Sequence, residues 1–497
     1  MSKRRPPASK RKQYDNRNKG YGPKGSDDEA DGKVPHPGSY ANDLYKTGAL
    51  PLPPPAPEEE GAPEPAKLSK RKLAFLVGFC GKAYQGMQMN PSSRTIQGEL
   101  ERALYNAGMI SAENYGFPKK YGWSNSARTD KGVHAAAQVV SARVAMPSTD
   151  LDKLRASLNG ELPEDVRVLD VKMVTKGFCA KTNRDKVRYS YFLPTYLLQP
   201  AAELGEAFRS RLGLAAAPSQ PWDAVTGPQK AALQEAFSEY RLPPSSLPAL
   251  AEAFGRFEGT KKYHNYTNGK DYEDPSANRY MMEFTTEENN GGIMYDSHGM
   301  EWVGLKVTGQ AFLLHQIRKM VSMGVDVARG SASADTFDKS FGDGRMKLSI
   351  APSQGLFLDM SFFDAYSNRK DFQYEPLEWV SDKPATTRWR EFKKTEICEH
   401  ILKEEREEHN FLQYIYQQTF LFTANRMGAY IFEAGAKGGD MRTPREGVGG
   451  GEGGAAKKAK VEGGETVAAA TATTTTTTAA ATTTAAAAAT TTTTTTS

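Results

Sequence analysis

The strongest constraint on folding is that apolar residues are scarce at both ends of the chain. Residues 1–70 are rich in Lys, Arg, Pro, Gly and Glu, and residues 437–497 pass from a Gly-rich stretch into an Ala/Thr tract such as TATTTTTTAAATTT. Such segments cannot bury enough apolar surface to offset the conformational entropy lost on folding. We therefore expect two disordered tails around a folded segment of roughly 365 residues.

The first part of this segment predicts six elements in the order strand, helix, strand, helix, strand, strand. Residues 72–79 form an apolar run that suits a buried strand, and Ile96, Leu100 and Leu104 share one face of a helix over 95–108. The remaining expected elements are strands at 137–144, 166–174 and 187–193 and a helix at 151–158. This order is typical of a ferredoxin-like α+β unit with an antiparallel sheet.

A second α+β run begins near residue 250, so we predict two ferredoxin-like halves, 71–199 and 249–381. Its expected elements are a helix ending at 257, strands at 278–285, 301–308 and 356–361, and a helix over 310–328. Residues 200–248 interrupt the two halves and predict a partly helical insertion. Residues 382–436 predict a helical extension with side chains too apolar to remain exposed, namely Phe411, Ile415, Phe420 and Phe422.

Composition argues against several classes of protein. The three cysteines lie far apart and no CxxC or HExxH spacing is present, so we expect a reduced intracellular protein without a metal site. No apolar run reaches transmembrane length and no signal-peptide core is evident, so we expect a soluble protein with no membrane partner.

The distribution of charge favours a ligand that carries phosphate groups. The net charge is only +5, which is weak evidence for a polyanionic partner. Residues 115–189, however, contain fourteen Lys and Arg against eight Asp and Glu, a local excess of 14 − 8 = +6. A local excess of this kind is expected where a protein binds nucleic acid.

The stretch SARTDKGVHAAA, residues 126–137, places Asp130 between Arg128 and Lys131. One interpretation is a hairpin turn, because Asp and Gly favour tight turns and an alternating run follows. The other is that two cations hold an ionised carboxylate at a backbone bend, where a substrate can reach it. Spacing alone favours the turn.

Two further segments combine unusual chemistry with the ends of expected elements. GFCGKAYQGMQMN, residues 78–90, has glycines that permit close backbone approach to a ligand, although a plain Gly-rich turn is the favoured interpretation of this segment taken alone. Residues 178–195 interleave basic residues with tyrosines, a mixture that suits unpaired RNA. An ordinary edge strand with a solvated basic face remains an alternative. The basic residues are Lys181, Arg184, Lys186 and Arg188, and the tyrosines are Tyr189 and Tyr191.

GQAFLLHQIRKMV, residues 309–321, predicts a helix that carries an arginine on its apolar side. Ala311, Leu314, Arg318 and Val321 would share that side. A buried unpaired guanidinium would cost several kcal/mol. We therefore expect a carboxylate partner for Arg318, and Asp130 is the candidate.

ARTDKGVHAAAQVVS resembles the catalytic motif of TruA-type tRNA pseudouridine synthases. The resemblance continues, in the family's order, through RYSY (188–191), HQIRKM (315–320) and APSQGL (351–356), and covers most of residues 72–365. GMQ (86–88), FEGT (257–260), HNYT (264–267) and the C-terminal helices are similar to the eukaryotic multisite, nuclear branch.

The resemblance implies an isomerase without cofactors that detaches uracil from ribose, turns it and rejoins it through carbon. It assigns Asp130 the catalytic attack, at C1′ of the sugar or C6 of the base, and assigns Tyr189 to packing against the target base. It pairs Arg318 with the aspartate. Arg128 and His134 would contact RNA or shape the loop. Together with Lys181, Arg184, Lys186 and Arg188 they form the expected RNA-binding set. Val187 stands where many relatives have Arg.

The partner implied is tRNA, at uridines of the anticodon stem and neighbouring sites, flipped out of the stem. Messenger and small nuclear RNA remain open as further substrates, and a monomer is expected. Basic clusters at residues 3–5, 10–12 and 457–460 favour the nucleus, although solvated tail charge explains them equally. Two alternatives are a glycosidase-like hydrolase, which normally needs a second carboxylate, and an inactive RNA-binding or chaperone module.

Overall fold

The computed structural model describes residues 68–90, 93–213, 221–287, 292–369, 373–379, 383–422 and 432–433. These residues belong to one compact unit. The predicted tails lie outside the described residues, apart from residues 68–70. None of the described helices has the length and apolar character that crossing a bilayer requires.

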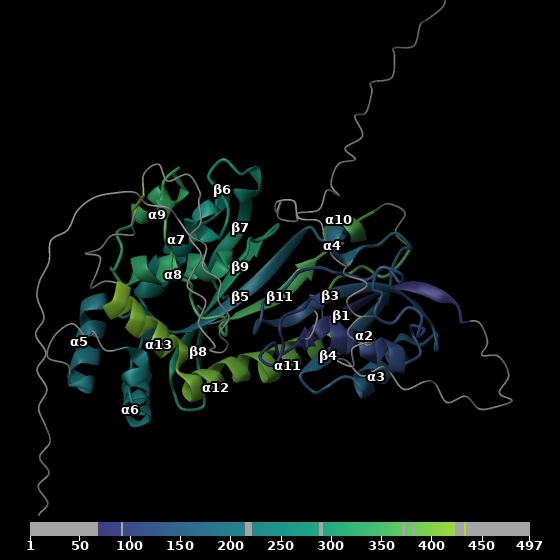
Figure 1. The fold of residues 1–497 in the computed structure, drawn as a ribbon, viewed down its shortest axis with the longest axis horizontal. Helices are drawn as coiled ribbons and strands as arrows, with labels where there is room; N and C mark the ends of the chain where they lie inside the picture. The colour runs from purple at the N-terminus through teal and green to yellow at the C-terminus, as the bar shows by residue number, and fades with distance from the viewer. Residues whose placement is uncertain are drawn as a thin grey trace, which may run out of the picture. The chain divides into compact units, whose positions relative to one another are not determined.

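The core of the fold is a ten-stranded sheet (Figure 1). Eight strands follow one path in the order β4-β1-β3-β11-β5-β9-β7-β6, while β2 pairs with β3 and β8 pairs with β9. The strands are β1 Lys70–Phe79, β2 Ser124–Asn125, β3 His134–Ala145, β4 Val166–Met173, β5 Lys186–Pro194, β6 Gly259–Lys262, β7 Asn278–Thr286, β8 Ile293–Tyr295, β9 Glu301–Gly309 and β11 Leu356–Phe362. The α+β class predicted from the sequence is confirmed.

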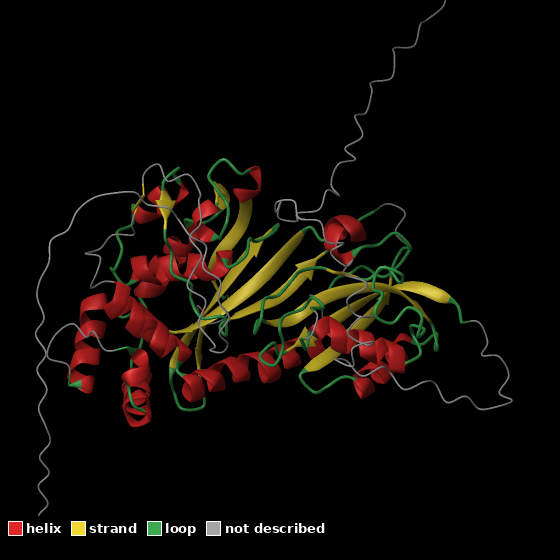
Figure 2. Cartoon of the chain, in the orientation of Figure 1, coloured by secondary structure: helices red, strands yellow, loops and turns green. Residues whose placement is uncertain are grey.

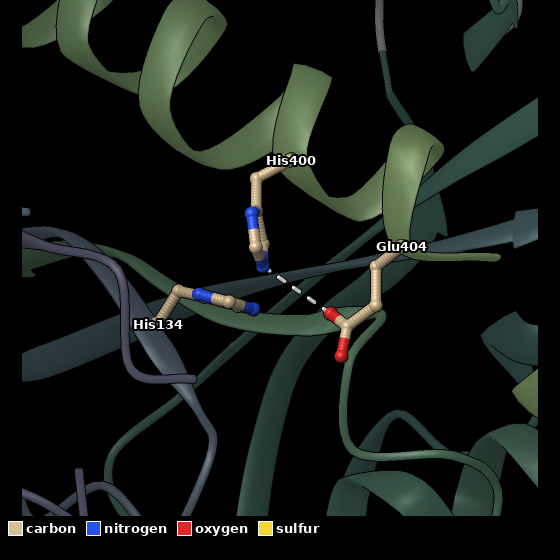
Figure 3. A group of neighbouring side chains, drawn as sticks. All are labelled: His134, His400 and Glu404. Atoms are coloured by element: carbon tan, nitrogen blue, oxygen red, sulfur yellow. Dashed lines mark ion pairs between the residues drawn. The ribbon is translucent and has the colours of Figure 1, made fainter. Parts of the chain in front are cut away.

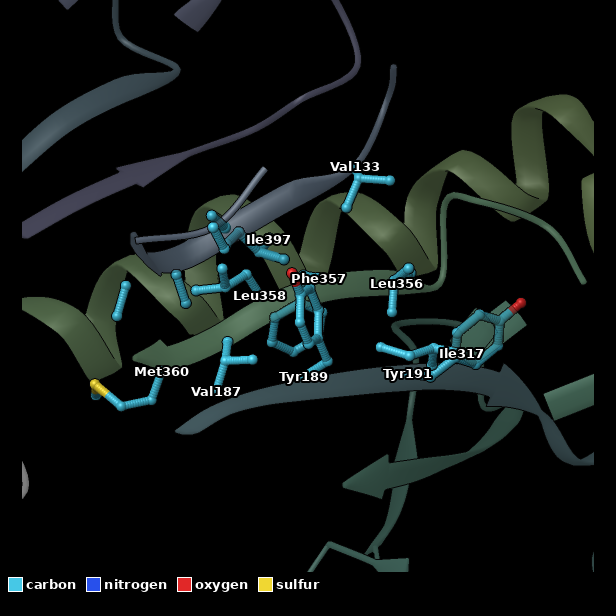
Figure 4. Packing of buried hydrophobic residues seen from close by; sticks show 14 of the residues in the cluster. Val133, Val187, Tyr189, Tyr191, Ile317, Leu356, Phe357, Leu358, Met360 and Ile397 are labelled. Atoms are coloured by element: carbon cyan, nitrogen blue, oxygen red, sulfur yellow. The ribbon is translucent and has the colours of Figure 1, made fainter. Parts of the chain in front are cut away.

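The two predicted halves share this one sheet, because β11 of the second half lies between β3 and β5 of the first. Within the described sheet, β11 and β3 form the only parallel pair, with Phe357 opposite His134, and β11 runs antiparallel to β5, with Leu358 opposite Tyr189. Side chains of β5 and β11 belong to one buried cluster (Figure 4). A strand distant in sequence therefore fixes the spacing between two strands of the first half.

Helices begin where the sequence supplies caps. The Thr95 hydroxyl accepts a hydrogen bond from the Gly98 amide at the start of α2 Ile96–Asn106, and Asp150 caps α3 Leu151–Glu161 in the same way. On the second half, α7 Ser246–Gly255 crosses α8 Gln316–Ala328. A Cβ at Gly324 would lie 2.3 Å from the Phe254 ring, so a glycine is required for this close approach.

The helix predicted over 310–328 begins later than expected. The described α8 starts at Gln316, because His315 has a left-handed backbone with φ of 61°. Residues 310–314 form a loop, so the prediction that Ala311 and Leu314 share a helical face with Arg318 is wrong. Leu314 is 52 % exposed. The positive φ at a non-glycine residue is a conformation that helix propensity does not anticipate.

The C-terminal extension forms a row of helices along the sheet (Figure 2). It consists of α11 Pro384–Phe392, a π-helix Lys393–Cys398, α12 Glu399–Glu408, α13 Asn410–Gln417 and a second π-helix Gln418–Phe422. Phe411, Ile415 and Phe420 are buried, as their apolar character predicted, and the side chain of Phe422 lies outside the described residues.

The insertion of residues 200–248 packs against this extension. Its helices are α5 Ala201–Leu212 and α6 Gly227–Ser238. The Phe208 ring lies 5.4 Å from the Tyr416 ring and 5.1 Å from the Phe237 ring, measured between centroids, and Trp222 also contacts Tyr416. The insertion therefore completes an aromatic core together with the last helices.

Glu405 of α12 joins the extension to both predicted halves of the sheet, through Tyr196 and Gln354. Its buried carboxylate accepts hydrogen bonds from the Phe411 and Leu412 amides, the Tyr196 hydroxyl and the Gln354 amide, at 2.8 to 3.1 Å. Burial raises the pKa of Glu405 to about 7, against the opposite effect of these hydrogen bonds. One carboxylate thus satisfies four donors that would otherwise be buried without a partner.

Glu405→Ala is expected to lower the free energy of unfolding by about 3 kcal/mol, because it leaves several buried donors unsatisfied. Chemical denaturation followed by circular dichroism measures this change. Glu407→Ala is the control, since Glu407 is exposed on the same helix and its ion pair, at 3.6 Å, is with exposed Lys403. A loss as small as the control's would show that Glu405 does not hold the extension.

Candidate active site

Asp130 lies on a loop whose first residues are held by hydrogen bonds to β3. The Gln138 side chain, buried in β3, donates to the Ala127 carbonyl at 2.6 Å and accepts from the Ser126 hydroxyl at 2.6 Å. The Val133 amide donates to the Asp130 carbonyl, which closes a turn ahead of β3. The carboxyl group of Asp130 is exposed at this turn. The two interpretations of this stretch, a turn and an exposed carboxylate at a bend, are therefore compatible, because one loop has both features.

Two glycines of the 78–90 segment clamp this loop from the side. A Cβ at Gly81 would lie 2.2 Å from the Val133 carbonyl oxygen, and one at Gly86 would lie 2.7 Å from the Thr129 carbonyl oxygen. Gly86 also has a φ of 98°, which favours glycine. The close backbone approach expected for this segment is made to the Asp130 loop.

Three titratable groups from distant parts of the chain lie within reach of the charge of Asp130. Burial raises the pKa of Tyr189 to about 12, and the charge of Asp130 adds to this rise while that of Arg184 opposes it. Burial lowers the pKa of Arg318, against the charge of Asp130. Burial lowers the pKa of His315, and the charge of Asp130 opposes that shift. The fold therefore brings Tyr189 and Arg318 within the range of the Asp130 charge, as the sequence predicted.

Arg318 is oriented by the APSQGL motif. Its Nε donates to the Ala351 carbonyl at 2.6 Å. Among the described ion pairs, none joins Arg318 to Asp130, so the two charges interact across a gap and without a direct hydrogen bond. The pairing of Arg318 with the aspartate stays a prediction.

Arg184 ties the Asp130 loop to the loop ahead of α8. Its guanidinium donates to the Ser126 carbonyl and, at 3.0 Å, to the Gln310 carbonyl. On the same loop, the Phe312 ring meets the Tyr189 ring edge-on, with 5.4 Å between centroids. Arg184 was predicted to bind RNA, and its hydrogen bonds in the structure give it a positioning role.

Arg188 and Lys186 lie on the face of β5 opposite to Tyr189, because alternate residues of a strand point to opposite sides. Arg188 contacts Asp359 at 2.5 Å, and Lys393 lies 2.8 Å from the same carboxylate, which is 1 % exposed. Burial would raise the pKa of Asp359, but the charges of Lys393 and Arg188 lower it overall. These contacts engage Arg188 in holding the extension.

The remaining predicted RNA-binding residues differ in exposure. Arg128 and Lys181 are exposed and can reach phosphate groups, whereas Lys186 is half-buried and pairs with Asp364 at 3.1 Å. His134 is fully buried. Of the two roles considered for His134, its position favours shaping the loop.

Comparison with known proteins agrees with this geometry. A profile of the family described as tRNA pseudouridine synthase matches residues 253–364, which include Arg318 and the APSQGL motif. The mouse pseudouridylate synthase 1 homolog is 35 % identical over 357 residues, covering 71 % of this chain and 74 % of the mouse protein. The chain belongs to the tRNA pseudouridine synthase family. The enzyme class predicted from the sequence is confirmed.

Fungal synthases are similar over comparable lengths. The Saccharomyces cerevisiae tRNA pseudouridine(27/28) synthase is 32 % identical over 382 residues, covering 70 % of this chain and 99 % of the yeast protein. The Kluyveromyces lactis tRNA pseudouridine synthase 1 is 33 % identical over 363 residues, covering 64 % of this chain and 65 % of the relative. Nothing in these comparisons favours an inactive RNA-binding module.

Behind the catalytic loop of this synthase, His134 meets two residues of α12 (Figure 3). The His134 and His400 rings lie 5.4 Å apart, and His400 Nε2 lies 3.4 Å from a Glu404 carboxylate oxygen. On its other side, His134 Nδ1 accepts a hydrogen bond from the Gly81 amide at 3.0 Å. The extension therefore contacts the base of the catalytic loop.

His134, His400 and Glu404 are residue types that bind divalent cations, and their ligand atoms lie within 4.8 Å of one another. The Gly81 hydrogen bond opposes such a role. An Nδ1 that accepts leaves the proton of a neutral ring on Nε2, whereas a metal ligand needs Nε2 unprotonated. A cation would have to displace that hydrogen bond, so the donor set fits a metal poorly.

Cys80, at the end of β1, extends this cluster. Burial would raise the pKa of its thiol, but the neighbouring His134 and His400 lower it to about 6. The proximity of Cys80 and Glu404 raises the pKa of His400 to about 9. A thiolate and an imidazolium therefore face each other at neutral pH. Sequence spacing gave no signal for this cluster, because its members come from three distant elements.

Alkylation of Cys80 is expected to rise with pH and reach half its maximum near pH 6, because the thiolate is the reactive form. His400→Gln should move that midpoint upward, since it removes the imidazolium. Iodoacetamide labelling with peptide mass spectrometry measures both in a Cys179→Ser background, which removes the other thiol whose pKa is lowered.

Cys398 provides the internal control, because burial raises the pKa of its thiol to about 12 and it should stay unlabelled over the same range. Melting curves confirm that the variants are folded. An unchanged midpoint in His400→Gln would contradict the assigned contact between Cys80 and His400.

Proposed function

We propose that this synthase isomerises uridines of the tRNA anticodon stem through attack by Asp130. The observation that carries the proposal is exposed Asp130 on a turn held by hydrogen bonds, with buried Tyr189 and half-buried Arg318 within reach of its charge. The name of the similar yeast synthase, which specifies positions 27 and 28, supports the anticodon stem.

The arrangement can perform each physical task of the isomerisation. Attack of the Asp130 carboxylate on C1′ of the ribose breaks the C1′–N1 bond, and the electron pair leaves with the base on N1. Addition of the carboxylate to C6 of the base is followed by cleavage of the same C1′–N1 bond, so either route frees the base to turn. Tyr189 offers an aromatic ring to the base, and Phe312 holds that ring edge-on. The cation of Arg318 stabilises negative charge as it develops. Each group comes from a different element, so the site exists only in the folded chain.

RNA binding is proposed to rest on exposed cations around this site. Arg128 and Lys131 flank Asp130, and Lys181 lies on the short helix α4 Ala180–Asn183. Phosphate contacts of this kind weaken with added salt. A uridine inside a stem must be flipped out to reach Asp130, and the unstacking energy has to come from such contacts.

A glycosidase is a weaker candidate. Hydrolysis of a glycosidic bond normally needs a second carboxyl group as general acid, about 5 to 10 Å from the first. The described groups whose pKa responds to the charge of Asp130 are a tyrosine, a histidine and an arginine. No carboxylate is among them.

We further propose that the chain acts as a monomer and that messenger or small nuclear RNA are additional substrates. Burial of the apolar residues of the extension within its own chain supports a monomer. Sedimentation velocity tests the first proposal, and a dimer would contradict it. A transcriptome-wide pseudouridine map with and without the protein tests the second.

Asp130→Asn is expected to give a folded protein that binds tRNA and forms no pseudouridine, because the amide keeps the turn propensity and loses the nucleophile. Arg318→Ala should be strongly impaired, and Arg318→Lys should retain more activity because it keeps the charge. Single-turnover assays on one tRNA transcript measure all three. Isomerisation by well-folded Asp130→Asn would overturn the catalytic assignment.

Nuclear localisation is proposed from the basic clusters at 3–5, 10–12 and 457–460, which lie outside the described residues. Replacing the basic residues of all three clusters by Ala in a fluorescently tagged chain should shift the protein to the cytoplasm. Replacing Arg17, Lys19 and Lys24, basic residues of the same tail outside the clusters, is the control. Unchanged nuclear accumulation after loss of the clusters would refute the proposal.

A further inference from the structure

His315 has a backbone conformation that its residue type disfavours. Its φ of 61° and ψ of 4° lie in the left-handed region, which Gly and Asn adopt more readily. Among the described non-glycine residues, His409 is the only other with positive φ. His409 has an evident structural reason, since it connects α12 to α13 and its Nδ1 contacts the Gln234 side chain at 3.0 Å.

The side chain of His315, in contrast, makes no bond that would explain the choice of histidine. It occupies the N-cap of α8 without capping the helix. Neither ring nitrogen has a hydrogen-bond partner among the described residues, and Nδ1 is buried. Strain combined with an unsatisfied polar group is a combination that clusters at functional sites.

The surroundings of His315 are those of the active site. Burial lowers its pKa, the charges of Arg318 and Lys319 on α8 lower it further, and the charge of Asp130 raises it. The loop that carries His315 is held against Tyr189 through Phe312 and against the Asp130 loop through Arg184. The imidazole is therefore neutral at neutral pH, and it lies within the range of the Asp130 charge.

The isomerisation needs a proton acceptor at this place. Once the C1′–C5 bond has formed, C5 of uracil still carries its hydrogen, and that proton must leave before the product is aromatic. This holds whether Asp130 attacks C1′ or C6. Of the three groups that respond to the charge of Asp130, Arg318 is a cation and the Tyr189 hydroxyl is a weak proton acceptor. His315 remains as the group with a free lone pair.

We propose that His315 is a catalytic residue that removes the C5 proton. A ring nitrogen takes the proton, and the electrons of the broken C5–H bond form the C5=C6 double bond. The pair displaced at C6 moves to N1 if Asp130 attacked C1′, or leaves with the Asp130 carboxylate if Asp130 attacked C6. N1 takes up a proton from water, and the imidazolium returns its own proton to water. The assignment rests on the proposed reaction at Asp130 and adds the base for its last step.

The test compares protiated and 5-deuterated uridine in single-turnover assays on one tRNA transcript. In His315→Asn the rate should fall about 100-fold, the range that a general base contributes. Deuterium should then slow the variant more than the wild type, because proton removal limits its rate. Tm should not decrease, since Asn adopts this backbone more easily. The wild-type rate should decline as acid protonates the imidazole, and the variant should lose that decline.

His409→Asn is the matched control, since it makes the same substitution at the other left-handed histidine and should keep wild-type turnover. His315→Gly accepts the backbone without strain and repeats the test if His315→Asn is misfolded. Wild-type turnover in either His315 variant, or slow turnover without an increased deuterium effect, would overturn the proposal. The proposed function fails on a different result, namely pseudouridine formation by Asp130→Asn.

Discussion

The active site depends on the insertion of β11 between β3 and β5. Backbone hydrogen bonding to β11 sets β3 and β5 at a fixed separation and register, with Phe357 opposite His134 on one side and Leu358 opposite Tyr189 on the other. The Asp130 loop directly precedes β3. The register of β3 and β5 against β11 therefore places this loop close to Tyr189. A shift by one residue would turn Tyr189 to the opposite face.

Buried charges then fasten the C-terminal extension to this sheet. Asp359 of β11 is held between Arg188 and Lys393, and the carboxylate of Glu405 satisfies donors from three segments. A buried charge is tolerated only with such partners, and removing one partner costs several kcal/mol. The extension is thereby tied to β5 and β11, and through His134 and His400 it also contacts the base of the catalytic loop.

Around Asp130 the chain accepts local costs that a purely structural loop would avoid. Asp130 is exposed within reach of buried Tyr189, Arg318 is partly buried with its charge, and His315 has a left-handed backbone. Gly81 and Gly86 bring the backbone of a second loop into contact with the first. Rigid neighbours are needed to maintain such strain, and the hydrogen bonds of Gln138 and Arg184 provide them.

Local sequence determined most of the elements and the chemistry of the site. Apolar periodicity located the strands and most helices, and the motif around Asp130 identified the reaction, because these signals depend on residues close together in the chain. Tertiary structure alone decided which residues meet. Contacts between segments far apart in sequence determine the position of β11 and the late start of α8 at a strained histidine. Such contacts also engage Arg184 and Arg188 inside the protein and bring Cys80 to His400. Periodicity reports which side of an element is apolar, and it carries no information about which distant segment will cover that side.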